Sequence, residues 1–205
     1  MTNILVKRSM HLLAALGVIV AAYTAINWAD LPVLQRLACL IFITLAMHGL
    51  EEYLFPGGFM QLVMRNMNVA FTNAEASKFA VVYAIVYLSF VPLFFTHVAW
   101  MVMAPMLLGI VEFIMHLFMI KLFKVGRPYT PGLASATCML PISIYAIVHV
   151  VQNNLMQPVQ WLFTLLFMAT CLWSASIILA KVNGMKYFDL IKTYRAGMLA
   201  KLKQM

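Results

Sequence analysis

Acidic side chains are scarce in this chain of 205 residues, which has six Asp and Glu against 14 Lys and Arg. Charged residues of both signs make up only 10% of the sequence and hydrophobic residues 64%, whereas soluble domains carry about 25% charged residues. A soluble core of this length could not hide so much apolar surface. This excludes an ordinary globular domain and indicates an integral membrane protein. No polar block is long enough to form a second domain.

Cysteine is also rare, and repeats are absent. Cys39, Cys138 and Cys171 all fall inside apolar stretches, where thiols behave as small hydrophobic groups, and an odd number gives no disulfide framework. The chain has no internal repeat of the kind that marks many transporters. Its formal charge of +8 clusters in loops and at the C-terminus. This pattern does not outline a nucleic-acid groove, so we expect no nucleic-acid partner.

Six apolar runs of about 20 residues predict helices long enough to cross a membrane. Proline- and glycine-containing segments separate most of them, and the break between the third and fourth runs rests on Pro92 and the Thr96-His97 pair. The expected fold is an all-α membrane bundle over residues 1–183, followed by a tail over residues 184–205. The six spans are expected at Ser9–Trp28, Val33–Leu54, Asn73–Phe95, Val98–Phe123, Ala134–Gln152 and Val159–Ala180.

Basic residues predict how the spans cross the membrane. All Lys and Arg residues except Arg36 fall on one side of the six-span arrangement, and basic loops stay in the cytoplasm. Both termini are therefore expected there. The tail Met185–Gln204 alternates basic and apolar residues, which fits either an amphipathic helix on membrane lipids or a solvated basic tail. One face of such a helix would carry Tyr187, Leu190, Ile191, Tyr194, Met198 and Leu202.

Polar residues cluster at the end of the second span. His48 is followed by Glu51 and Glu52, at the i+3 and i+4 spacings that place side chains on one face of a helix. A charged side chain near the hydrocarbon core costs about 2.5 kcal/mol or more, so such residues usually have a partner and a function. One nitrogen donor and two carboxylates here indicate a metal site or a buried acid–base pair.

A second pair with the same spacing lies in the fourth span. Glu112 and His116 are separated by four residues. Spans two and four run in the same direction, and a rise of 1.5 Å per residue places His48 roughly 22 Å, and Glu112 roughly 21 Å, from the outer ends of their spans. We therefore expect the two pairs to meet in the cytoplasmic half of the bilayer, as inward-facing pairs do in metal-binding bundles. Otherwise they form ordinary polar contacts between helices.

Imidazole and carboxylate donors suit iron, manganese or zinc. Several carboxylates cannot all stay ionised in a low dielectric without cations or protons, so one or two divalent metal ions are expected. Glu75 is ambiguous, because Thr72-Asn-Ala-Glu75 also matches a capping box at the start of the third span. The candidate metal ligands are His48, Glu51, Glu52, Glu75, Glu112 and His116, and the candidate catalytic residues among them are Glu51, Glu52 and Glu112.

The turn before the fifth span lies on the same side of the membrane as these residues. It contains Tyr129, Pro131 and Gly132. These residues could shape an entrance to the site, although a Pro-Gly turn before a helix is the simpler interpretation.

The second span ends in the run His48-Gly-Leu-Glu51-Glu52-Tyr53-Leu-Phe-Pro56-Gly57. This run resembles the uncharacterised family named for its HXXEE motif, with a complete match at the His and both Glu residues of the motif. Members of this family are small bacterial membrane proteins. The resemblance therefore implies a location in a bacterial inner membrane, and the family name supplies no reaction.

Three functions fit these features. The first is a metal-dependent membrane enzyme acting on a small lipophilic substrate, with the metal serving as a Lewis acid or, if iron, activating oxygen. The sequence lacks the histidine-rich clusters of membrane desaturases and hydroxylases, which argues against their mechanism. The second is a metal-free isomerase or cyclase of a sterol- or terpene-like molecule, in which a carboxylic acid held neutral by its apolar site protonates a double bond. The third is a proton-coupled transporter, because buried carboxylates and histidines also build proton relays.

Overall fold

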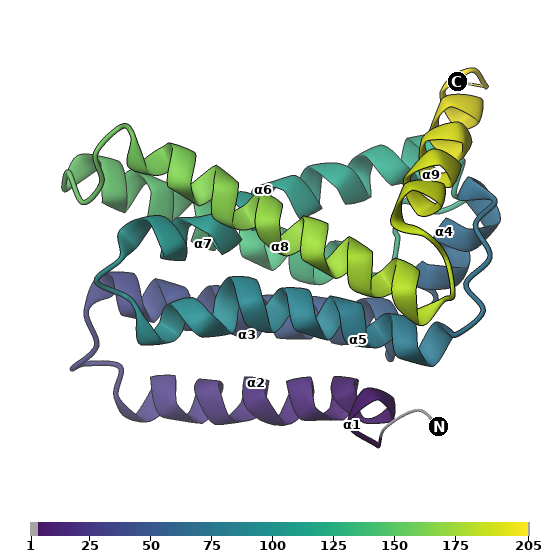
Figure 1. The fold of residues 1–205 in the computed structure, drawn as a ribbon. Helices are drawn as coiled ribbons and strands as arrows, with labels where there is room; N and C mark the ends of the chain where they lie inside the picture. Colours follow the sequence, from purple (N-terminus) through teal and green to yellow (C-terminus); the bar gives the residue numbers. More distant parts are fainter. Residues whose placement is uncertain (1–3, 205) are drawn as a thin grey trace.

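The computed structural model describes residues 4–204, and over that range its regular structure is entirely helical. Six of its helices are long and apolar enough to cross a membrane, and Figure 1 shows them side by side along a common direction. The six predicted spans are confirmed, with each end within two residues of its expected position. The spans are α2 (Ser9–Ile26), α3 (Val33–Tyr53), Ala74–Phe94, α6 (Ala99–Leu122), α7 (Leu133–Gln152) and α8 (Gln160–Val182).

The third span is not a uniform helix. It begins as α5 (Ala74–Ile85), continues as one turn of π-helix, η1 (Val86–Phe90), and ends as a 3₁₀ turn, η2 (Val91–Phe94). Pro92 has no backbone N–H and so cannot donate to the carbonyl of Leu88 one turn earlier. The wider π-helical turn lies just before Pro92, and the tighter 3₁₀ turn contains it. Pro92 thus helps to end the span close to the break predicted from the sequence.

Helix α3 lies at the centre of the bundle. It packs against α2, α5, α6 and α7. In the most apolar stretch of α3, 56% is buried inside the protein, against 11% in the corresponding stretch of α8 at the edge. Ile41, Phe42 and Leu45 on α3 are fully or almost fully buried. Because α3 is covered on several sides, the polar residues at its end must find their partners inside the protein.

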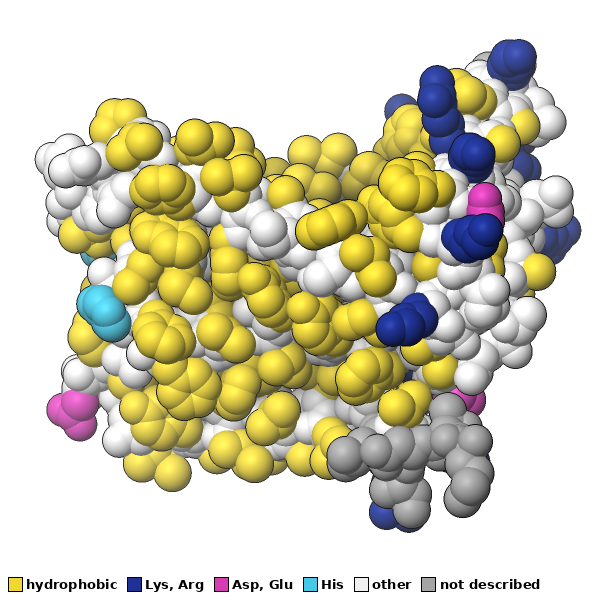
Figure 2. Space-filling view, viewed as in Figure 1, with side chains coloured by type: hydrophobic (Ala, Val, Ile, Leu, Met, Phe, Trp, Pro, Cys, Tyr) yellow, Lys and Arg dark blue, Asp and Glu magenta, His cyan; other side chains and the backbone are white. Residues whose placement is uncertain are grey.

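Both described ends of the chain lie at the same end of the bundle (Figure 1), together with α1 (Ile4–Lys7), α4 (Phe59–Met67) and α9 (Tyr187–Leu202). Figure 2 shows Lys and Arg side chains gathered at this end, while apolar side chains cover the middle of the molecule. Arg36 lies in the first turn of α3 at the opposite end, where its side chain donates to the carbonyl oxygen of Leu31 at 2.7 Å. The one-sided distribution of basic residues is therefore present in the fold, and the cytoplasmic position of that end stays a prediction.

Helix α9 crosses the end of the bundle at a steep angle to the spans (Figure 1) and packs against α4 and α8. Leu190 on its inner side is 1% exposed. Part of the face that was predicted to contact lipid therefore packs against α4 instead. Large apolar side chains also remain on its outer side, at Phe188, Ile191, Leu199 and Leu202. Its contact with a leaflet, and the division of the chain after residue 183, stay predictions.

Candidate metal centre

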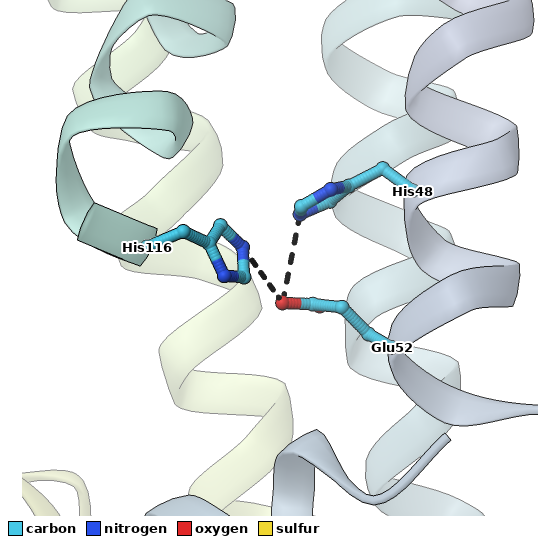
Figure 3. Close-up of side chains that lie close together, drawn as sticks. All are labelled: His48, Glu52 and His116. Carbon is cyan, nitrogen blue, oxygen red and sulfur yellow. Dashed lines mark ion pairs between the residues drawn. The ribbon is translucent and has the colours of Figure 1, made fainter. Parts of the chain in front are cut away.

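Two pairs of polar side chains meet between α3 and α6. Nε2 of His48 and Nε2 of His116 each lie 3.5 Å from Oε1 of Glu52, and Figure 3 shows both rings turned toward this oxygen. Oε2 of Glu112 lies 3.8 Å from Nε2 of His48 and 4.0 Å from Nε2 of His116. The structure thus brings the two i, i+4 pairs together, as their equal depth predicts.

The spacing of these atoms fits one metal ion. Ligands about 2.1 Å from a tetrahedral ion lie about 3.4 Å apart, close to the distances of 3.5 Å from each Nε2 to Glu52. The donor atoms of His48, Glu52 and His116 all lie within 4.8 Å of one another. Oε2 of Glu112 lies close to both imidazoles, so the His48–Glu52–His116 group, with Glu112 beside it, could hold one metal ion.

His116 is the most constrained member of the group. Its side chain is fully buried, and its Nε2 atom has no hydrogen-bond partner among the described residues. A buried polar atom without a partner costs about 1–3 kcal/mol, so such an atom in a native protein calls for an explanation, such as a catalytic role or a bound water or ion. A metal ion among the four donors would satisfy the lone pair of this nitrogen.

The other ring nitrogen of each histidine is held by the turn before α7. Nδ1 of His48 lies 3.0 Å from the carbonyl oxygen of Gly132 and 3.0 Å from Oγ of Ser135. A carbonyl oxygen can only accept, so Nδ1 carries the proton and Nε2 keeps its lone pair for a ligand. Nδ1 of His116 lies 2.9 Å from Oγ1 of Thr130. These contacts turn both Nε2 atoms toward the carboxylates, the arrangement that metal-binding histidines require.

Gly132 fits closely against both rings. Its φ of +102° lies in the left-handed region, which only glycine adopts readily. A Cβ atom at this position would lie 2.6 Å from Cε1 of His116 and 2.8 Å from Cε1 of His48. The Pro-Gly turn predicted from the sequence is therefore confirmed, and it also lets the backbone form a wall of the site.

Glu51 does not join this group. Its carboxylate accepts hydrogen bonds from the backbone N–H groups of Ala134 at 3.2 Å and Ser135 at 2.8 Å, from the Ser135 hydroxyl at 2.5 Å and from the Tyr129 hydroxyl at 2.8 Å. The first N–H groups of a helix need acceptors from outside it, and a carboxylate is favoured there. Glu51 therefore caps α7. This corrects the expectation that all three side chains of the motif converge, because residues i+3 and i+4 are rotated about 100° from each other around α3.

Glu75 is also separate from the group. Its side chain is 60% exposed and pairs with Nζ of Lys78 at 2.7 Å. The cap of α5 is Asn73, whose side-chain oxygen accepts from the N–H of Ala76 at 3.0 Å. The predicted capping box is thus corrected, because the helix begins one residue later than a cap at Thr72 requires.

Thr130 and Ser135, which contact the two histidines, escaped prediction from the sequence. The available signal is their position, since they flank the Pro-Gly turn on the same side of the membrane as the motif. Their hydroxyl groups reach the imidazoles only because α7 packs against both α3 and α6. A single sequence does not show this packing.

A cavity of about 480 Å³ begins at His48, Glu52 and Glu112 and extends between α5, α6 and α8. His48, Glu52 and Glu112 contribute polar atoms to its wall, and most of the other lining residues are apolar. Leu88 of the π-helical turn lies on its surface, and Tyr194 and Met198 of α9 also border it. The group of donors is therefore reached from an apolar chamber inside the bundle.

Comparison with known families gives one match, to a family described as "Protein of unknown function with HXXEE motif", over residues 39–146. The matched region covers just over half of the chain and contains the four donor residues and the turn that holds the two histidines. Comparisons with curated proteins and with solved structures found no match. The chain thus belongs to the HXXEE-motif family of proteins of unknown function.

Proposed function

We propose that this protein is a membrane-embedded, metal-dependent enzyme acting on a lipophilic substrate. The observation that carries the proposal is the buried Nε2 of His116, which lacks a hydrogen-bond partner among the described residues and faces Glu52 at the wall of the apolar cavity. One divalent ion would be held by His48, Glu52, Glu112 and His116.

The charge of the group supports a divalent ion. Two carboxylates and two neutral imidazoles carry a charge of −2, which such an ion would neutralise. Two carboxylates facing each other in a low-dielectric site are unfavourable without a cation or protons. Mixed nitrogen and oxygen donors suit iron, manganese or zinc. Bound there, the ion would supply Lewis-acid chemistry or, if iron, oxygen activation.

The cavity supports a lipophilic substrate. Its volume of about 480 Å³ lies within the range of about 300–1,000 Å³ that small-molecule sites occupy. Most of its wall is apolar, and Glu52 and Glu112 mark one polar part. A molecule with an apolar body and one reactive polar group fits such a chamber, with the polar group directed at the metal. Membrane lipids would be both the surroundings of the protein and a source of such molecules.

The distribution of basic residues supports the orientation of the site. The metal-binding group lies at the ends of α3 and α6 that are nearer to α4 and α9, where Lys and Arg side chains gather (Figure 2). Basic ends of membrane proteins stay in the cytoplasm. The reaction would then take place in the cytoplasmic half of the membrane.

Metal analysis of the purified protein tests the proposal. Protein from cells supplied with iron, manganese and zinc should carry about one equivalent of metal, because the donor atoms of His48, Glu52 and His116 lie within 4.8 Å of one another and fit a single ion. His116→Ala and Glu52→Ala should lose it, while His149→Ala should keep it, since His149 lies at the far end of α7 and contacts Asn153. Wild-type protein that takes up none of the three metals would contradict the proposal.

The same distances also fit a metal-free acid–base pair. Imidazole and carboxylate atoms 3.5 Å apart, as between His116 and Glu52, could exchange a proton and protonate a double bond of a sterol- or terpene-like substrate. Metal-free protein that still binds such a molecule, with binding lost in Glu52→Ala, would favour this second function. Metal-free protein that moves protons into liposomes would favour a transporter.

A further inference from the structure

A second cavity lies on another side of Glu52. Its volume is about 80 Å³, and Glu52, Tyr53 and Met60 line both this cavity and the large apolar one. Glu52 is therefore reached from two directions. The wall between the two chambers includes these three side chains.

The small cavity lies between the end of α3, the start of α4 and the start of α5. Gly58 and Gln61 come from the start of α4, and Ala74, Glu75 and Lys78 come from the first turns of α5. The ion pair of Glu75 with Lys78 lies at its edge, with the Glu75 side chain 60% and the Lys78 side chain 20% exposed. Charged groups thus extend from the surface to the cavity that ends at Glu52.

The chemistry of the two linings differs. A buried water needs about 10–15 Å³ of accessible volume and two to four polar partners. The small cavity offers about 80 Å³ beside two carboxylates, an ammonium group and an amide. The large cavity has mainly apolar walls away from the donor group. Transfer of a polar molecule or a charge through such a wall is costly, so the polar chamber is the favourable route for water.

We propose that the small cavity is the aqueous entrance to the metal-binding group. Water and protons pass from the Glu75–Lys78 pair to Glu52, while the lipophilic substrate reaches the same group from the large cavity. This inference rests on the proposed function for the role of Glu52, and it narrows the reaction to one that consumes or releases water or a proton. It also gives the Glu75–Lys78 pair a role at the mouth of this route.

Hydroxyl-radical footprinting tests the route directly, because radicals made from water by X-rays oxidise side chains beside water. In lipid nanodiscs, Met60 should be oxidised although it is 7% exposed. Met47 is 52% exposed on the apolar surface of the bundle, so lipid should protect it. Ala74→Phe places a ring at the small cavity and should slow oxidation of Met60 several-fold. Ala84→Phe places the same ring in the large cavity and should leave the rate unchanged.

A second variant removes the polar lining without adding a ring. Glu75→Leu combined with Lys78→Leu makes the mouth of the small cavity apolar and should slow oxidation of Met60 in the same way. Protection of Met60 in the wild type, or slowing by Ala84→Phe in place of Ala74→Phe, would overturn the inference. The readout does not depend on bound metal, so metal analysis of the same samples reports separately on the proposed function.

Discussion

Glu51 accepts hydrogen bonds from both the backbone N–H and the hydroxyl group of Ser135, at 2.8 and 2.5 Å. Oγ of Ser135 also lies 3.0 Å from Nδ1 of His48, so polar contacts connect Glu51 to an imidazole of the candidate metal centre. The two Glu residues of the motif therefore differ in position. Glu51 holds α7 and the ring of His48 in place, while Glu52 faces the other donor atoms.

This division predicts different effects for two matched substitutions. Glu51→Gln replaces one acceptor oxygen by an amide group that faces the N–H groups of Ala134 and Ser135. Loss of such an outer partner should weaken metal binding about 10- to 100-fold, while saturating metal should still fill the site. Glu52→Gln removes a donor and should leave the protein without metal. Metal content and competition with a chelator measure both effects.

The prediction has a clear opposite outcome. If Glu51→Gln loses metal as completely as Glu52→Gln even at saturating concentration, Glu51 is a ligand. The contacts of Glu51 with the first turn of α7 would then have to rearrange when metal binds.

A second prediction concerns the space beside the imidazoles. Gly132→Ala would place a Cβ atom 2.6 Å from Cε1 of His116 and 2.8 Å from Cε1 of His48, so both rings would have to move. We expect loss of metal binding together with lower thermal stability. Gly184→Ala is the matched control, because Gly184 also has positive φ, at +68°, but nothing within 4 Å of an added Cβ. The control should lose some stability through backbone strain and keep its metal.

If Gly132→Ala and Gly184→Ala retain metal equally, the close approach of the turn to the imidazoles is not needed for binding. Thermal unfolding of both variants separates the strain that they share from the contact that only Gly132 makes.

Much of the fold could be predicted from the sequence because its signals are local. An apolar run of about 20 residues identifies a span wherever it lies, and the rise per residue places His48 and Glu112 at matching depths without knowledge of their neighbours. The i, i+4 spacing likewise predicts that Glu52 faces the same way as His48, as the distance of 3.5 Å between them shows.

The remaining features depend on packing between distant segments. The i, i+3 spacing places Glu51 near the helix face of His48, which predicts that it is a ligand. Its actual partner, Ser135, lies 84 residues away in the sequence, so the spacing within α3 does not reveal it. The short helix α4 escaped prediction because its 9 residues are too few to show a span. Glu75 was ambiguous, since an acid in the first turn of a helix fits several roles.

A third prediction tests the contact that orients His116. Thr130→Val removes the hydroxyl group 2.9 Å from Nδ1 of His116 with little change in shape. Metal affinity should fall about 10-fold or more, because the ring loses the partner that fixes its orientation. Thr137→Val is the matched control, since Thr137 is exposed and its hydroxyl donates to the carbonyl of Leu133 in its own helix. Equal affinities for the two variants would contradict an orienting role for Thr130.

The last prediction concerns the bond from Tyr129 to Glu51, which has a length of 2.8 Å. Burial, together with this bond to the carboxylate, raises the pKa of Tyr129 from 10.0 to about 12. A group whose pKa is higher in the folded than in the unfolded state contributes stability that is fully present below the unfolded pKa and is lost as the pH rises through the folded value. The bond should therefore persist unchanged between about pH 6 and pH 9.

Tyr129→Phe should lower the free energy of unfolding by about 1 kcal/mol, and by the same amount at pH 6 and pH 9. Tyr145→Phe is the matched control, because Tyr145 is 56% exposed on α7. Unfolding of both variants in detergent at the two pH values measures the difference. If the effect of Tyr129→Phe disappeared by pH 9, the phenol would ionise far below pH 12, and Glu51 would then hold α7 through its bonds to Ala134 and Ser135 alone.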